Sequence, residues 1–283
     1  MSQAKADSVL QHQFESVGQQ FEAGKLGVWV FLLTEVLFFA GPFTAYAVFR
    51  SSHPEIFAYA HYHLDLELGA LNTCVLLVSS LTAALALRSA MRSEQRRLVV
   101  CIALTIACGA AFMAIKVLEY RHKFHEGLLP GASFNPSIEV WELPSFQRRH
   151  PEAASFAERY KLPPLVDLRV VRDRPRATLD KHPSRAELEP LLHAGVLGKQ
   201  AEYPNVPSRP KNAHQFFGLY FLMTGLHGIH VLAGMGIWTW LLVRARRKAF
   251  SRAYYGPIDY AALYWHFVDL VWIYLFPLLY LIH

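Results

Sequence analysis

The stretch Tyr260–Ile282, which reads YAALYWHFVDLVWIYLFPLLYLI, decides the fold of this chain. Asp269 is its single charged residue, and it exceeds the roughly 20 apolar residues that cross a bilayer as a helix. Its apolar residues neither alternate with period two nor follow a strict heptad. Because a helix satisfies its own backbone hydrogen bonds in lipid, the stretch predicts a transmembrane helix.

Four earlier stretches have the same character: Leu26–Phe49, Leu68–Leu87, Leu98–Leu118 and Phe216–Val243. The 283-residue chain is 53% hydrophobic and only 18% charged. A β-barrel would need shorter segments that alternate in hydropathy. The sequence therefore predicts an all-α membrane protein with five transmembrane helices in a bundle.

Composition argues against several other classes of protein. The three cysteines, Cys74, Cys101 and Cys108, lie inside predicted spans, and no C-x-x-C motif occurs. A disulfide framework, a thiolate metal site and a covalently bound c-type haem are therefore not expected. The polar residues 1–25 lack the pattern of a secretory signal, so we expect the first span to remain and to direct insertion.

Basic residues are distributed unevenly over the loops. Arginines and lysines crowd residues 88–97 and 244–252, whereas residues 51–65 contain neither. Short basic loops stay on the cytoplasmic side of a membrane. We therefore expect a cytoplasmic N-terminus and a periplasmic C-terminus, and we attribute the net charge of +6 to orientation in the membrane and not to nucleic-acid binding.

A long polar segment separates the third and fourth spans. Residues 126–212 are rich in proline, mixed in charge and poor in apolar residues. Such a composition cannot form an independent core, so we expect an extended periplasmic excursion that lies on its own membrane domain or on a partner. The predicted organisation is thus residues 1–125 with three helices, residues 126–212 outside the membrane, and residues 213–283 with two helices.

Ionisable residues inside the spans are the best indicators of function, because they are costly in lipid. Glu35 is the only charge in its span, and it is either a carboxyl that holds a proton near a proton route or a protonated packing residue at a helix interface. Lys116 and Glu119 stand three apart on one helix face, which favours an interfacial ion pair.

Two histidines lie in the fourth predicted span. His227 and His230 share one helix face, and Gly225, Gly228 and Gly234 lie in the same stretch. Small residues let helices approach closely in lipid. We therefore expect these histidines to hydrogen-bond across a tight helix contact and not to bind a metal.

His266 and Asp269 also stand three apart, which suggests a buried polar contact with each other or with a neighbouring helix or subunit. Near the end of the span, Pro277 is expected to bend the helix.

Four of these segments resemble subunit III of the haem–copper respiratory oxidases. Tyr264–Trp272, which reads YWHFVDLVW, is similar to the terminal signature of that family. His227-Gly-Ile-His230 followed by Gly234 resembles its glycine–histidine motif. Glu35 falls where the family has a membrane carboxylate, and Glu119-Tyr120 matches a Glu-Tyr pair at a helix end. The resemblance covers essentially the whole membrane portion but not residues 126–212.

The resemblance implies an accessory subunit of a proton-pumping cytochrome c oxidase in aerobic respiration. Haem and copper would reside in partner subunits I and II, and this chain would have no catalytic residue and no metal site. It would stabilise the catalytic subunit, bind phospholipid in a cleft between its helices and support proton uptake. Its own residues agree, because they include no plausible ligand set for two haems and a copper.

The chain also departs from the family pattern. Many members have seven spans, and five indicate the short bacterial form and hence a bacterial inner membrane. Asp259 replaces a glutamate near the start of the last helix, which puts the family's lipid contact there in doubt. Residues 126–212 would lie on the side where cytochrome c docks, and we expect them to brace neighbouring subunits or a respiratory supercomplex partner.

Two alternatives remain at this point. The chain could serve a quinol oxidase or a nitric oxide reductase, because its sequence does not choose the electron donor or acceptor. It could also be a membrane cytochrome in which His227 and His230 ligate haem. An optical spectrum of the purified chain and the identity of its co-purifying proteins would distinguish these readings.

Overall fold

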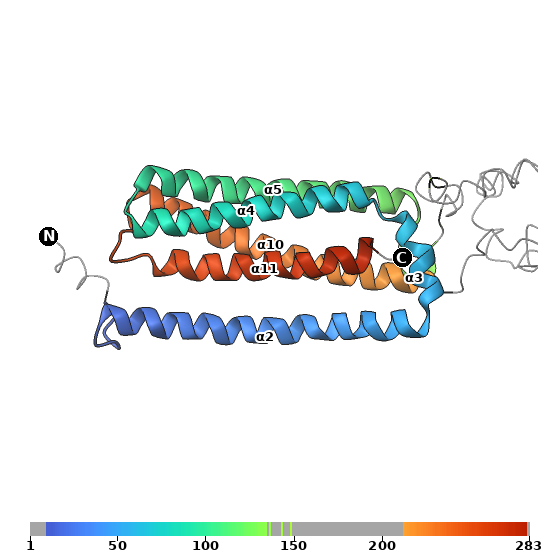
Figure 1. The fold of residues 1–283 in the computed structure, drawn as a ribbon, viewed down its shortest axis with the longest axis horizontal. Coiled ribbons are helices and arrows are strands. Elements are labelled where there is room, and N and C mark those ends of the chain that lie inside the picture. The colour runs from blue at the N-terminus through green and yellow to red at the C-terminus, as the bar shows by residue number, and fades with distance from the viewer. Residues whose placement is uncertain (1–9, 135, 137–142, 144–147, 149–211, 282–283) are drawn as a thin grey trace, which may run out of the picture. The chain divides into compact units, whose positions relative to one another are not determined.

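The structure, a computed structural model, describes residues 10–134, 136, 143, 148 and 212–281, and helices dominate this part of the chain. Its five long helices are α2 (Val17–Ser52), α4 (Leu66–Met91), α5 (Gln95–His125), α10 (His214–Arg246) and α11 (Gly256–Tyr280) (Figure 1). Each is long and apolar enough to cross a membrane. The predicted fold class, an all-α protein with five membrane-spanning helices, is confirmed.

The helices extend beyond most of the predicted spans. For example, α2 begins at Val17, nine residues before the predicted Leu26. Polar residues continue the helical backbone past the apolar stretch, because helix formation does not require every residue to lie in lipid. At the other end of the chain, α11 ends at Tyr280, and the predicted end at Ile282 lies outside the described residues.

One predicted connection contains helices that the sequence did not indicate. Residues 51–65 include α3 (Pro54–Ala60) and the 3-10 helix η1 (His61–His63). Pro54 stands in the first turn of α3, where its missing N–H costs no hydrogen bond. Asp65 then begins α4 by accepting hydrogen bonds from the backbone N–H groups of Glu67 and Leu68, at 2.9 and 3.1 Å. Most of residues 126–212 lies outside the described residues, so their predicted excursion stays a prediction.

The chain divides into two compact units. The first, which we call the bundle unit, consists of Met1–Ser52, Asp65–Arg121 and Leu219–His283. The second, the small unit, consists of His53–Leu64 and His122–Gly218. All the candidate site residues named above belong to the bundle unit.

Helix α11 is the centre of the bundle unit. Of its apolar stretch, 56% is buried, against 11% for α2. The Trp265 and Trp272 indole N–H groups donate to Ser79 and Thr73 of α4, each at 3.0 Å. Further hydrogen bonds join α11 to the other three helices: Tyr260 to Phe21 O of α2, Lys116 of α5 to Tyr280, and Tyr264 to His230 O of α10. The aromatic residues of the terminal stretch thus connect all five helices.

Helices α4 and α5 are joined through small polar side chains. Thr82 and Thr105 hydroxyls lie 2.9 Å apart, and Ser79 Oγ donates to Thr105 O at 3.3 Å. The α4 face that makes these contacts also buries Ala83 and Ala86. Small residues permit the close helix approach that membrane bundles need, since lipid provides no hydrophobic drive for association.

The small unit has an aromatic core of its own. Phe57 of α3 packs edge-on against Phe216, with ring centroids 5.3 Å apart. His63 lies 6.0 Å from the Phe217 ring, and its carbonyl accepts a hydrogen bond from buried Lys123 at 3.2 Å. The Lys123 charge is thereby satisfied by a backbone acceptor.

Candidate functional site

Glu35 and His230 form a polar pair between α2 and α10. His230 Nε2 lies 2.9 Å from Glu35 Oε2, and the two side chains are 16% and 18% exposed. They are 195 residues apart in sequence. Both sit in the apolar stretches of their helices, so lipid-like surroundings and not water determine their chemistry.

The hydrogen bonds of His230 restrict where its proton resides. His230 Nδ1 lies 2.7 Å from Leu226 O, and a carbonyl oxygen only accepts, so we assign the Nδ1 hydrogen to that bond. The 2.9 Å contact between Nε2 and Glu35 Oε2 then holds one further proton, either on the carboxyl or on the imidazole. The contact between the two side chains is therefore a hydrogen bond built on a single shared proton.

Aromatic rings enclose this pair on α2 and α11. The ring centroids of Phe39 and Phe38 lie 5.1 and 6.1 Å from that of His230. Tyr264 of α11 donates from its hydroxyl to His230 O at 3.0 Å, which adds a third helix to the site. These contacts hold the histidine ring in one orientation while leaving the pair partly accessible.

Lys116 and Glu119 form the ion pair that their spacing predicts, with Nζ and Oε2 2.8 Å apart and both side chains buried. Two phenols complete the cluster, which we call the Lys116 network. Tyr220 of α10 and Tyr280 of α11 donate to Glu119 Oε1 at 2.9 and 2.6 Å, and Lys116 donates to Tyr280 at 2.8 Å. Lys116 Nζ also lies 4.5 Å from the Trp272 ring centroid. The network thus joins α5, α10 and α11 through paired, buried polar groups.

His227 does not follow the expectation of a hydrogen bond across a helix contact. Its side chain is buried, and neither ring nitrogen has a hydrogen-bond partner among the residues that the structure describes. Its ring instead packs between Phe112 and Trp272, with centroids 5.5 and 5.3 Å away. His230 turns toward α2 and His227 toward α5 and α11, so the two rings serve different contacts.

We expect His227→Phe to leave the stability of the chain unchanged or to raise it by about 1 kcal/mol, because it removes buried polar atoms that lack partners. The matched control is His230→Phe, which deprives Glu35 of its partner and should lower stability. The thermal unfolding midpoints of the purified full-length variants in detergent provide the comparison. A marked loss for His227→Phe would show that its ring nitrogens are satisfied in the native protein.

The polar residues of α11 are not paired with each other. His266 Nε2 lies 3.2 Å from Ser80 O of α4. Asp269 is buried beside the Ser80 side chain, although neither of its oxygens has a hydrogen bond of good geometry within the described chain. Helix α4 thus lies against both residues, which explains why the i, i+3 spacing produces no ion pair. Asp259 approaches Lys25 of α2 at 3.7 Å.

The sequence reasoning missed Tyr220, Tyr280 and Thr224 as site residues. Thr224 shares a 2.5 Å hydrogen bond with Tyr120, and the two tyrosines complete the Lys116 network. Hydroxyl groups inside apolar stretches were the available signal, but spacing along one helix does not reveal a partner on another. Among the described residues, no group of three or more His, Cys, Asp or Glu is placed to hold a metal ion.

Comparison with known proteins relates the sequence of this chain to one family. The family described as cytochrome c oxidase subunit III matches residues 9–126 and 195–283 of the chain. A Mycobacterium tuberculosis protein, probable cytochrome c oxidase subunit 3, is 40% identical over 91 residues. That match covers 31% of this chain and 44% of the mycobacterial protein, so the chain aligns with less than half the length of this relative.

Longer matches occur at lower identity. Probable cytochrome c oxidase subunit 3 of Nocardia farcinica is 23% identical, with 91% of this chain and 87% of the relative covered. Quinol oxidase subunit 3 of Bacillus subtilis is 21% identical, with coverage of 93% and 90%. The family match contains both residues of the Glu35–His230 pair and every member of the Lys116 network. With most of its length matched and its five membrane-spanning helices in place, this chain belongs to the cytochrome c oxidase subunit III family.

Proposed function

We propose that the chain is the accessory subunit III of a haem–copper terminal oxidase, in which partner subunits I and II hold the haem and copper. Membership of the family, the names of its oxidase relatives and the integral membrane architecture support this proposal. The chain stabilises the catalytic subunit, binds phospholipid and supports proton uptake during turnover. It lies in a bacterial inner membrane, with its N-terminus in the cytoplasm and its C-terminus in the periplasm.

The Glu35–His230 pair carries the proton-uptake part of the proposal. A carboxyl and an imidazole 2.9 Å apart in an apolar helix stretch hold one proton between them. Their partial exposure within the chain leaves the pair open to a neighbouring subunit, with which that proton exchanges. The pair therefore acts as a proton-holding site beside the route into the catalytic subunit, not as a redox group.

Replacing Glu35 by alanine tests this role. General acid–base groups that transfer a proton in a transition state contribute factors of roughly 10²–10⁴ to a rate, and a site that only holds a proton beside the route acts more weakly. We expect Glu35→Ala to leave the initial rate of electron transfer nearly intact but to lower proton uptake and to hasten inactivation during turnover. The assembled oxidase, followed by oxygen consumption and by pH change in vesicles, provides the measurement.

The control variant is Glu67→Ala, which removes an exposed carboxylate from the first turn of α4. This variant should pump protons and endure turnover like the parent oxidase. Unchanged pumping and an unchanged inactivation rate in Glu35→Ala would rule out a proton role for Glu35.

A quinol oxidase is the second candidate for the complex. The Bacillus subtilis relative is named a quinol oxidase subunit and aligns with 93% of this chain, so the donor is either cytochrome c or quinol. The subunits that co-purify in mild detergent distinguish the two, because a subunit II with a copper-binding motif indicates cytochrome c. Deleting Ser145–Pro207 tests whether residues 126–212 contact a supercomplex partner, because full association of the shortened chain on a native gel would exclude that contact.

A further inference from the structure

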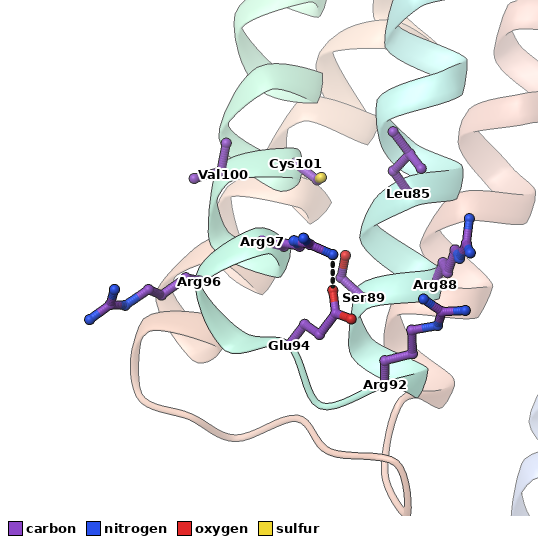
Figure 2. A pocket seen from close by; sticks show the side chains of 9 residues that line it. All are labelled: Leu85, Arg88, Ser89, Arg92, Glu94, Arg96, Arg97, Val100 and Cys101. Carbon is purple, nitrogen blue, oxygen red and sulfur yellow. Dashed lines mark hydrogen bonds and ion pairs between the residues drawn. The ribbon is translucent and has the colours of Figure 1, made fainter.

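A basic pocket lies between the end of α4 and the start of α5 (Figure 2). None of its lining residues belongs to the Glu35–His230 pair or to the Lys116 network. Its volume is about 380 Å³, within the range of small-ligand sites. Four arginines and one glutamate line it, together with a serine and an apolar wall. The lining residues are Leu85, Arg88, Ser89, Arg92, Glu94, Arg96, Arg97, Val100 and Cys101.

The local sequence explains the concentration of positive charge. Arg88 and Arg92 are four apart at the end of α4, so they share one helix face. Ser93 has a positive φ of 59°, which reverses the chain and brings the first turn of α5 alongside. Arg97 extends from that turn and donates to Glu94 Oε2 at 2.9 Å (Figure 2). The turn thus gathers arginines from two helices and leaves a net positive site.

The pocket is amphipathic along the helix axes. The arginines lie nearer the hairpin turn, and Leu85, Val100 and Cys101 lie farther from it along the two helices (Figure 2). Leu85 and Val100 are both exposed. Since α4 and α5 are membrane-spanning helices, this apolar wall stands at the level of the acyl chains and the arginines at the level of the headgroups.

We propose that this pocket binds an anionic phospholipid, with the phosphate at the arginines and the upper acyl chain along Leu85 and Val100. Basic pockets between transmembrane helices recognise anionic headgroups through charge-assisted hydrogen bonds. The apolar wall favours a lipid over a soluble anion or an acidic protein loop, since neither would reach the acyl-chain level. This inference deepens the phospholipid binding of the proposed function by naming a site and a lipid class. It requires only that the chain is inserted in a membrane, so its failure would leave the proton role of Glu35 untouched.

A second cavity in the bundle unit provides an internal contrast. It is larger, about 540 Å³, and lies between the start of α2 and the start of α11, where Phe21, Tyr255 and Tyr260 contribute to its walls. None of its lining residues is charged. Size alone therefore does not distinguish the proposed site, whereas its arginines do.

The test measures lipid binding to the full-length chain, purified in detergent and stripped of lipid. Dioleoyl phosphatidylglycerol and dioleoyl phosphatidylcholine are titrated separately, and bound lipid is counted by native mass spectrometry. We expect Arg88→Gln/Arg92→Gln to weaken phosphatidylglycerol binding about 30-fold, which corresponds to about 2 kcal/mol for two arginines near the membrane surface. Arg88→Lys/Arg92→Lys keeps the charge and should retain most of the binding.

The matched control is Arg246→Gln/Arg247→Gln. These exposed arginines stand at the same end of the bundle, where the Gln95 side chain donates to Ala245 O, and they do not line the pocket. The control should bind phosphatidylglycerol like the parent chain.

Three results would overturn the proposal. Equal losses in the two arginine-to-glutamine pairs would indicate diffuse surface charge. Equal binding of the two lipids by the parent chain, or no loss in Arg88→Gln/Arg92→Gln, would show that the pocket does not select an anionic headgroup. Binding of glycerol 3-phosphate as tight as that of the whole lipid would identify a soluble-anion site, because the apolar wall would then contribute nothing. The thermal unfolding midpoint checks that each variant is folded.

Discussion

Lys116→Met is expected to lower the thermal unfolding midpoint of the full-length chain by about 10 °C, because breaking a buried ion pair costs about 3–5 kcal/mol. In the variant, Glu119 would keep the hydrogen bonds from Tyr220 and Tyr280 but lose its counter-charge. The lost ammonium group also lies 4.5 Å from the Trp272 ring centroid, a cation–π contact that methionine does not make. Tryptophan fluorescence in mild detergent would follow the transition.

The chain contains a matched control for this prediction. Arg97 and Glu94 form another i, i+3 pair at the start of α5, the helix that contains Lys116. Their N–O distance is also short, at 2.9 Å, but the Arg97 side chain is 74% exposed. Exposed pairs contribute at most about 1 kcal/mol, so Arg97→Met should change the midpoint little.

A double variant separates the unpaired charge from the other contacts of Lys116. In Lys116→Met/Glu119→Gln no buried charge is left alone, and the amide oxygen can still accept from the phenols. The double variant should therefore be more stable than Lys116→Met alone. If Lys116→Met melted with the parent chain, Glu119 would not be a charged partner in the native state.

Gly234→Ala is expected to destabilise the bundle unit by about 1–3 kcal/mol, the usual cost of overpacking a core. A Cβ atom at Gly234 would stand 2.6 Å from Cε3 and Cζ3 of Trp265. The indole has no room to withdraw, since it is fully buried and its N–H is bonded to Ser79 at 3.0 Å. On its other edge, a Cβ at Gly109 would come within 3.1 Å of Trp265 Cη2.

Gly225→Ala is the control on the same helix. A Cβ atom at Gly225 would meet nothing within 4 Å, and alanine favours a helix over glycine by about 1 kcal/mol in soluble hosts. We expect this variant to be as stable as the parent chain or more so, by thermal unfolding under the same conditions. Equal behaviour of Gly225→Ala and Gly234→Ala would show that α10 and α11 are less closely packed than the structure indicates. Only Gly234 among the three glycines of the histidine motif makes such a close approach.

Both predictions concern contacts of α11, the helix whose sequence predicted the fold. Trp265 fills the space that Gly109 and Gly234 leave, and Trp272 lies against Lys116 and His227. The aromatic residues of Tyr264–Trp272 are thus explained by packing in this chain, because they occupy the positions where four other helices converge. The Glu35–His230 pair lies at the edge of this core, where both side chains are partly exposed.

The sequence by itself determined the number, type and approximate position of the membrane-spanning helices. These features depend only on the local run of apolar residues, and not on which other helices pack against that run. The Lys116–Glu119 pair was predictable for the same reason, because residues three apart meet on one helix face. The short helix α3 was missed, since seven residues between two spans are too few for a clear periodic signal.

Only the tertiary structure decided which polar groups meet across helices. It joined Glu35 to His230 over 195 positions, directed His227 into an aromatic site without a hydrogen-bond partner among the described residues, and gave His266 a partner on α4 in place of Asp269. It also assembled the arginine pocket from two helix ends. The physical reason is that these contacts depend on how each helix is rotated and packed against its neighbours, and hydropathy along one chain does not specify that rotation.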